Sequence, residues 1–314
     1  MPLPDQTATV ATDHERTGSA APGRDTDHPD VPGPAVPGPA VPDSAAARPP
    51  AGSAAGDARL EQDLGQALER GQMTLHFQPR LCLERRCIVG AEALARWPHR
   101  RRGMIPPVTF IPIAEQSGQI VRLGAWVLET ACVQAASWPG EQVVSVNVSP
   151  AQLAHGTLFG HVVAALQRSG LPVARLELEL TESMMVDARI ETLLTLSAIR
   201  DLGIGIALDD FGTGYASLAT LKRLPLTVMK LDRSLVRGML RYPEDTAIAH
   251  AVIAVGRALD LSIVAEGVDN EAQCRALLAL GCREGQSFFL GRPMPGDSFR
   301  QLLASASHRT DASA

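Results

Sequence analysis

Strand-like runs and helical stretches alternate along most of this chain of 314 residues. Short runs of Val, Ile, Leu and Ala are each followed by a segment with helical apolar spacing, at about 30 residues per unit. Such alternation is typical of a largely parallel sheet covered by helices. We expect strands at 73–78, 88–97, 143–148, 175–181, 204–209, 227–231, 262–266 and 285–289. We expect helices at 58–70, 119–137, 157–169, 188–201, 215–222, 245–259 and 270–280.

Eight strands, in a folded part whose composition gives no sign of a second domain, favour one closed β/α barrel. An open doubly wound sheet is the alternative, but it gathers its ligands at one switch point. Polar residues here follow six or seven different strands, which suits a ring better. Pro79 is expected to end the first strand, because proline lacks the N–H that a strand ladder uses.

The first 56 residues differ in composition from the rest of the chain. They hold 11 of the 23 prolines and no Phe, Trp or Tyr. Such a segment buries too little apolar area to offset its ordering entropy, so we expect disorder. The predicted organisation is a disordered Pro/Ala/Gly-rich tail at 1–57, a folded domain at 58–306 and a flexible tail at 307–314. A protein partner for the first tail is left open.

Charge and cysteine content exclude several classes of protein. Residues 1–56 contain seven acidic and three basic residues, which leaves the remainder close to neutral and without the basic face of a nucleic-acid binder. The sequence has no secretory signal and no apolar run of about 18 residues, so no membrane association is expected. Five cysteines without CxxC spacing argue against a disulfide framework and fit a reducing cytosol. The expected location is cytoplasmic.

Polar side chains end the strand-like runs, and in a barrel these ends converge on one face. They are Glu92, Asn147, Glu179, Glu182, Asp209, Asp210, Lys230 and Glu266. So much negative charge in one place is unfavourable unless cations neutralise it. Oxygen ligands without histidine favour magnesium or manganese over zinc. Individually each residue also has a structural interpretation, such as a helix-capping acid or a surface lysine.

Asp209 and Asp210 are neighbours, so in an extended strand they would point to opposite faces. The glycine-rich stretch 211–214 directly after them supplies the bend that would let both acids face the mouth. Two metal ions about 3.5–4 Å apart are the arrangement that clamps a phosphoryl group and activates water.

Ordered motifs in the chain resemble those of the EAL domain family. They are Glu92-Ala93-Leu94, Phe110-Ile111-Pro112-Ile113-Ala114-Glu115, Ser145-Val146-Asn147-Val148-Ser149, Glu179-Leu180-Thr181-Glu182, Asp209-Asp210-Phe211-Gly212-Thr213-Gly214-Tyr215, Lys230-Leu231-Asp232, Glu266-Gly267-Val268, and Gln286 before Phe288-Phe289. The resemblance covers about residues 60–305. It implies a modified (β/α)8 TIM-like barrel in which one strand runs antiparallel. It also implies metal-dependent hydrolysis of cyclic di-GMP, a bacterial second messenger, to linear pGpG by metal-activated water.

The resemblance also assigns roles to single residues. Two Mg²⁺ or Mn²⁺ ions would be held by Glu92, Asn147, Glu179, Asp209, Asp210 and Glu266. The catalytic residues would be Lys230, Glu266, Glu182 and Gln286. Lys230 would orient the attacking water, and Glu182 would hold the loop that begins at Asp210. Gln78, Arg96 and Asp232 would contact the substrate, Arg96 through a phosphate.

Three positions depart from the family pattern: Asp269 stands for a usual Glu, Ser287 for Gly and Ala216 for Ser. Asp269 would either support Glu266 or Lys230, with a reach one methylene short, or cap the following helix. Two alternatives to an active phosphodiesterase stay open. One is a catalytically weak cyclic di-GMP receptor or protein-interaction module, and the other is an unrelated metal-dependent barrel hydrolase. The family resemblance also implies a homodimer.

Overall fold

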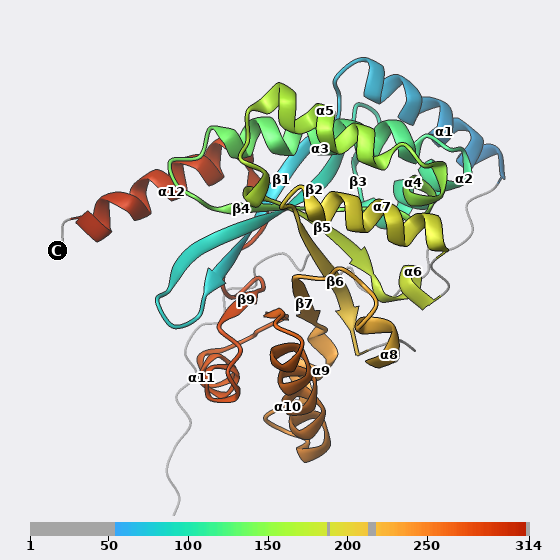
Figure 1. Ribbon diagram of the computed structural model, residues 1–314. Helices are drawn as coiled ribbons and strands as arrows, with labels where there is room; N and C mark the ends of the chain where they lie inside the picture. The colour runs from blue at the N-terminus through green and yellow to red at the C-terminus, as the bar shows by residue number, and fades with distance from the viewer. Residues whose placement is uncertain (1–53, 187–188, 213–217, 312–314) are drawn as a thin grey trace, which may run out of the picture. The chain divides into compact units, whose positions relative to one another are not determined.

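The computed structural model describes residues 54–186, 189–212 and 218–311 (Figure 1). Residues 1–53 of the tail expected at 1–57, and the stretch 213–217, which includes Ala216, lie outside the described residues. Residues 54–57 belong to the first helix. Within the described part of the chain, eight strands form a ring. These are β1 (Thr74–Cys82), β2 (Cys87–His99), β4 (Val143–Asn147), β5 (Leu176–Thr181), β6 (Gly205–Phe211), β7 (Val228–Leu231), β8 (Ser262–Glu266) and β9 (Glu284–Gln286).

The ring follows the order β1-β9-β8-β7-β6-β5-β4-β2, and pairing between β1 and β2 closes it. β1 runs antiparallel to both neighbours. All other neighbours in the ring pair in parallel. The predicted closed barrel with one antiparallel strand is therefore confirmed. The carboxyl ends of the parallel strands open on one side of the ring, which we call the mouth.

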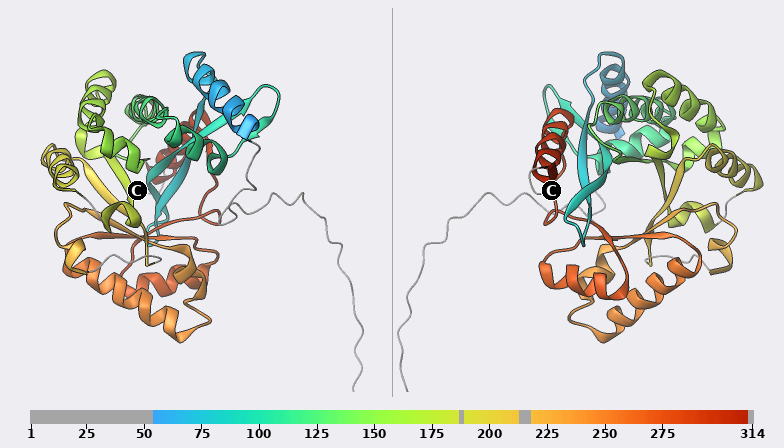
Figure 2. Two further views of the ribbon diagram at one scale, coloured as in Figure 1. Left: turned by 90° about the vertical axis from the view of Figure 1, so that its right-hand side faces the viewer. Right: turned by 60° about the vertical axis from the view of Figure 1, so that its left-hand side comes forward.

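Helices cover the outside of the ring (Figures 1 and 2). They are α1 (Ala54–Glu69), α2 (Pro107–Gln116), α3 (Ile120–Ala136), α4 (Pro150–His155), α5 (Leu158–Ser169), α6 (Glu182–Val186), α7 (Ile190–Asp201), α8 (Leu218–Leu221), α9 (Arg233–Gly238), α10 (Pro243–Ala258), α11 (Glu271–Leu280) and α12 (Gly296–Asp311). Two short strands, β3 (Gly103–Ile105) and β10 (Met294–Pro295), extend the sheet. α3 packs on α5 and β4, and α10 packs on β7 and β8. Among the described residues, no helix combines the length and apolar character that a membrane crossing requires.

β5 shows how alternation separates core from site. Leu176, Leu178 and Leu180 are fully buried in the main hydrophobic core. Glu177 and Glu179 alternate with them and therefore point into the ring, because successive side chains of a strand face opposite sides. Both carboxylates are buried. The barrel interior is thus the place where this chain keeps buried charge.

Pro79 does not end the first strand as expected. β1 continues beyond it, and Pro79 pairs with Ala91 of β2. On its other side, β1 pairs with β10 before Pro79 and with β9 from Arg80 onward. Pro79 falls between these two pairings, so its missing N–H removes no ladder hydrogen bond on that side.

Other element boundaries also differ from the prediction. The strand expected at 285–289 ends at Gln286, because a turn follows in which Gly291 N donates to Ser287 O at 2.9 Å. Ser287 has an ordinary φ, so the backbone does not require glycine there. Helices α2, α4, α6, α9 and α12 were not predicted. α12 continues to Asp311, past the expected end of the domain at residue 306.

Candidate metal-binding active site at the barrel mouth

A buried lysine lies at the centre of the predicted site. Lys230, on β7, is 1% exposed. Its Nζ lies 3.0 Å from Glu179 Oε2, 3.1 Å from Asp209 Oδ1 and 2.7 Å from Glu266 Oε1. The surface role that a lone lysine suggests is therefore wrong for Lys230. Burial acts to lower the pKa of Lys230, but the surrounding carboxylates, Glu179 first, outweigh it and hold this pKa well above its usual value.

A second group of contacts joins β2, β4 and β9. Asn147 Nδ2 donates to Glu92 Oε1 at 2.6 Å. Gln286 Nε2 donates to Glu92 Oε2 at 2.6 Å. Glu92 is 9% exposed, so both of its carboxylate oxygens are fixed in a nearly dry environment. The structure thus brings together three of the predicted site residues from distant parts of the sequence.

Asp209 and Asp210 converge with Glu266, as the metal interpretation requires. Each of these residues offers an oxygen within 4.8 Å of the others. The bend that turns both aspartates to one side lies at Asp210 itself, which has φ +57°. Gly212, in the glycine-rich stretch that was expected to supply the bend, also has a positive φ, of +106°. The β6–β7 register shifts between Leu208 and Phe211, the interval that contains both aspartates.

The carboxyls of the mouth are difficult to ionise together. Burial raises the pKa of Glu179 well above its usual value, and Lys230 only partly opposes this. Burial likewise raises the pKa of Glu266 to about 7. The pKa of Asp210 is raised by burial and by the neighbouring charge of Asp209. Both effects disfavour an additional negative charge, and a bound cation would reverse them.

An unpaired oxygen tests whether a metal fits. Glu179 Oε2 contacts Lys230, but Glu179 Oε1 is buried without a hydrogen-bond partner among the described residues. A buried carboxylate oxygen with no partner is costly. The donor set around it consists of carboxylate and amide oxygens, which suits hard divalent cations. The residues present therefore fit the predicted metal ions.

Glu182 lies beside the chain segment that follows Asp210. It is 4% exposed and begins α6. Its Oε2 accepts a hydrogen bond from Gly212 N at 3.3 Å. Gly212 lies two residues after Asp210, with Phe211 between them. The Glu182 carboxylate thus contacts the backbone of the loop that begins at Asp210.

The three residues expected to contact substrate differ in surroundings. Gln78 lies opposite Glu92 in the β1–β2 pair, and its Nε2 lies 3.5 Å from Gly291 O. Arg96 is half-buried, and burial lowers the pKa of its guanidinium. Asp232 is the N-cap of α9, where it accepts a hydrogen bond from Ser234 N at 2.8 Å.

Asp269 has neither of the roles expected from the sequence. The N-cap of α11 is Asn270, whose side chain accepts from Gln273 N. The Asp269 side chain is 58% exposed and lies 3.5 Å from Arg237 Nε. The three ion-pair partners of Lys230 are other carboxylates. Asp269, which stands where the family usually has Glu, is therefore not among the described ion-pair partners of Lys230.

The sequence prediction missed a second buried ionic group inside the barrel. Arg80 Nη1 and Ser145 Oγ each donate to Glu177 Oε1 at 2.7 Å. Arg80 Nε also lies 3.3 Å from Glu284 Oε2. Each of these four residues stands two positions from a predicted site residue on the same strand. The period of two along each strand is the signal that could have found them.

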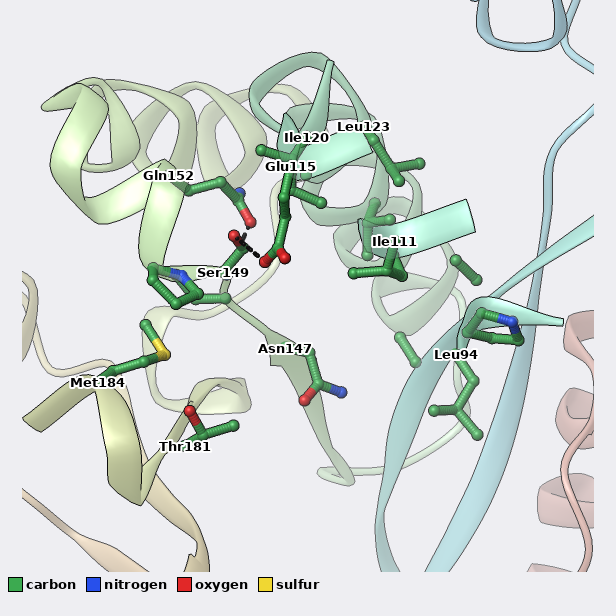
Figure 3. A pocket seen from close by; sticks show the side chains of 17 residues that line it. Leu94, Ile111, Glu115, Ile120, Leu123, Asn147, Ser149, Gln152, Thr181 and Met184 are labelled. Carbon is green, nitrogen blue, oxygen red and sulfur yellow. Dashed lines mark hydrogen bonds between the residues drawn. The ribbon is translucent and has the colours of Figure 1, made fainter. Parts of the chain in front are cut away.

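An apolar cavity of about 300 Å³ adjoins the mouth at Asn147 (Figure 3). The sticks in Figure 3 show Leu94, Ile111 and Leu123 on one side, with Asn147 and Thr181 toward the strands. Ser149 Oγ donates to Glu115 Oε1 at 2.7 Å on the cavity wall. The acidic mouth thus continues into a pocket of different chemistry.

Comparisons with known proteins show which family has this sequence. The model of the EAL domain matches residues 61–293. The chain belongs to the EAL domain family. It is 45% identical to the bifunctional diguanylate cyclase/cyclic di-GMP phosphodiesterase MucR of Pseudomonas aeruginosa over 79% of this chain and 36% of that protein. It is 38% identical to the cyclic di-GMP phosphodiesterase PdeR of Escherichia coli over 77% of this chain and 37% of that protein.

Solved EAL structures show the same fold. The MucR phosphodiesterase in complex with c-di-GMP is 44% identical, with a TM-score of 0.73, over 77% of this chain and 99% of that chain. The EAL domain of Mycobacterium smegmatis DcpA is 36% identical, with a TM-score of 0.64, over 74% of this chain and 98% of that chain. The chain spans little more than a third of the length of MucR and PdeR, so the match concerns their EAL parts.

Proposed function

We propose that this EAL domain hydrolyses one phosphodiester bond of cyclic di-GMP and releases linear pGpG. The observation that carries the proposal is the buried Lys230, which contacts Glu179, Asp209 and Glu266. Beside it, Glu179 Oε1 has no hydrogen-bond partner in the part of the chain that the structure describes. The names of MucR and PdeR, and the ligand in the MucR complex, support cyclic di-GMP as the substrate.

The charge balance of the mouth supports two divalent ions. Five carboxylates surround one ammonium group, which leaves a formal charge of −4 when all are ionised; the carboxylates are Glu92, Glu179, Asp209, Asp210 and Glu266. Two divalent cations would neutralise this charge. We assign one ion to Glu92, Asn147, Glu179 and Asp209, and the other to Asp209, Asp210 and Glu266. Magnesium or manganese suits these oxygen ligands.

When bound, such ions would supply Lewis-acid polarisation of the phosphate and a more acidic water. The protein residues position the reacting groups. Lys230 keeps its proton and stabilises the negative charge that develops on the phosphate. Gln286 and Asn147 hold the Glu92 carboxylate in one orientation. Glu182 fixes the segment after Asp210 through Gly212.

The substrate would lie across the mouth and the apolar cavity. A purine base offers a flat apolar face, which suits the wall formed by Leu94, Ile111 and Leu123. We assign Arg96 to a substrate phosphate, since a guanidinium group binds phosphate oxygens well. Gln78 would contact the substrate beside Glu92. Asp232 would act mainly through its charge, because its carboxylate already caps α9.

A cyclic di-GMP receptor without catalysis is the second candidate. Hydrolysis is favoured because every carboxylate of the proposed metal sites is present and three of them contact Lys230. The test is incubation of purified protein with cyclic di-GMP and magnesium or manganese, with separation of the products by chromatography. We expect linear pGpG as the product. Substrate binding without turnover in either metal would support the receptor instead.

A further inference from the structure

Two cysteines close the β1–β2 hairpin directly opposite each other. Cys82 ends β1, Cys87 begins β2, and the two residues are register partners. The Cα atoms of opposite residues in antiparallel strands lie about 4.5–5.5 Å apart, and their side chains share one face. Cα separations of about 4.4–6.8 Å are those that a disulfide bond spans. The register of the hairpin therefore places the two Cα atoms in the range that a disulfide bond spans.

The loop between the two cysteines is anchored to the rest of the barrel. Arg86 N donates to Cys82 O at 2.9 Å, and Leu83 N donates to Arg283 O at 2.8 Å. The Arg86 guanidinium forms an ion pair with Glu271 on α11, which lies near the hairpin tip (Figure 1). A fixed loop keeps the pair aligned, so bond formation would lose little additional chain entropy.

The two thiols are chemically different. Cys87 is exposed, so a small oxidant reaches it directly. Cys82 is buried, and Arg85 N points at its Sγ at 3.5 Å. Burial acts to raise the pKa of Cys82, but hydrogen bonds from Arg85 outweigh it and hold this pKa below its usual value. The lowered pKa enlarges the thiolate fraction of Cys82, and the thiolate is the form that attacks a disulfide.

In the other three cysteines the pKa of the thiol is raised rather than lowered. Cys132, Cys274 and Cys282 are all buried. Burial raises the pKa of Cys132 and of Cys282 to about 12, and it also raises the pKa of Cys274. Buried thiols of this kind are inert toward oxidants. Oxidation of the folded protein should therefore select the hairpin pair.

We propose that Cys82 and Cys87 form a reversible intramolecular disulfide bond when the protein meets a low-molecular-weight disulfide such as oxidised glutathione. In the first step the Cys87 thiolate attacks one sulfur of the oxidant, and one glutathione leaves as a thiolate that takes up a proton. In the second step the Cys82 thiolate attacks Cys87 Sγ and displaces the second glutathione. Two protein thiols are oxidised, and one disulfide is reduced to two thiols.

The bond would form away from the mouth. Cys87 begins β2, whereas Glu92 lies further along the same strand at the mouth. Cys82 also pairs in register with Glu284 of β9, so the bond would tie the end of the ring opposite the mouth. Neither cysteine belongs to the proposed metal or substrate sites. The inference therefore stands or falls independently of the hydrolytic activity.

Tryptic mapping tests the bond, because Arg85 and Arg86 lie between the two cysteines. The folded full chain is treated with oxidised glutathione, free thiols are alkylated under denaturing conditions, and the protein is digested with trypsin. We expect the peptides that contain Cys82 and Cys87 to remain joined, and to separate after reduction. Recovery of both cysteines as alkylated thiols, or as two separate glutathione adducts, would overturn the proposal.

Two variants make the mapping specific. Cys87→Ser removes an exposed thiol, so the fold should persist and the joined peptides should disappear. Cys274→Ser is the matched control, because it alters a cysteine outside the pair and should leave the joined peptides in place. Thermal unfolding of both variants checks their fold. Joined peptides in Cys87→Ser would show that Cys82 bonds to a different cysteine, which would also refute the pairing.

Discussion

Arg80→Met tests the buried ion pair inside the barrel. Arg80 is 6% exposed and Glu177 is 3% exposed, and the two are joined at 2.7 Å. Methionine keeps an unbranched, flexible apolar side chain but removes the guanidinium group and its positive charge. The Glu177 carboxylate would then be buried with Ser145 Oγ as its hydrogen-bond donor and without a cation in contact.

The expected cost follows from that loss. Removal of one partner of a buried ion pair costs about 3–5 kcal/mol, because the other charge stays buried and uncompensated. For a domain of this size, that corresponds to a fall in Tm of roughly 6–20 °C. Arg80→Met/Glu177→Gln should cost less than Arg80→Met alone, since the buried Glu177 charge is then no longer left without its partner. Glu284, whose side chain is 29% exposed, loses its contact with Arg80 in both variants.

Urea unfolding followed by tryptophan fluorescence measures this free energy, since Trp97 and Trp138 are both buried. Arg168→Met is the matched control. Arg168 pairs with Glu129 on the surface, with side-chain exposures of 61% and 43%. It should change the free energy of unfolding by at most about 1 kcal/mol. A cost for Arg80→Met no larger than that of Arg168→Met would refute the reasoning.

Four further predictions concern the mouth. Excess chelator should abolish hydrolysis of cyclic di-GMP and magnesium or manganese should restore it; full activity in chelator would exclude the proposed metal sites. Glu92→Ala should lower turnover by about 100-fold or more, whereas Glu84→Ala, at an exposed loop position, should leave it unchanged, as measured by pGpG release. Magnesium should raise Tm more at pH 8 than at pH 5, because the Glu266 carboxyl has a pKa of 4.5 unfolded and about 7 folded. Between pH 4.5 and about 7 the folded protein therefore binds a proton that the unfolded protein has released, and the metal-free protein loses stability as the pH rises through this range. A magnesium-induced rise in Tm that did not depend on pH would contradict this prediction. Asp269→Glu should change turnover by less than about twofold, since Asp269 is an exposed partner of Arg237; a large rise would restore a catalytic role for this position.

The barrel was predictable because its pattern is local. The period of two in strands and the helical spacing between them depend only on neighbouring residues, and they located all eight ring strands. Boundaries depended on tertiary pairing. Pro79 stays within β1 because it falls between the pairings with β10 and β9, a fact that no local sequence signal contains.

The sequence was likewise sufficient to name candidate site residues, whereas their contacts required the tertiary structure. Glu92 and Gln286 are 194 positions apart in sequence and are joined at 2.6 Å. Asp269 illustrates a contact that the sequence suggested and the structure does not show. Its position suggested that it supports Glu266 or Lys230, whereas its described ion-pair partner is Arg237. The direction of a side chain depends on which elements pack beside it, and a single sequence does not specify that.

By itself, the sequence determined an alternating β/α chain whose strand ends carry carboxylate and amide side chains and one lysine. Only the closed ring determined that Lys230 is 1% exposed and contacts three carboxylates. The ring also placed Arg80 against Glu177, 97 positions away in the sequence. The physical reason is that hydrophobic periodicity is a property of neighbours along the chain, whereas burial and charge pairing arise only when distant strands close around a common interior.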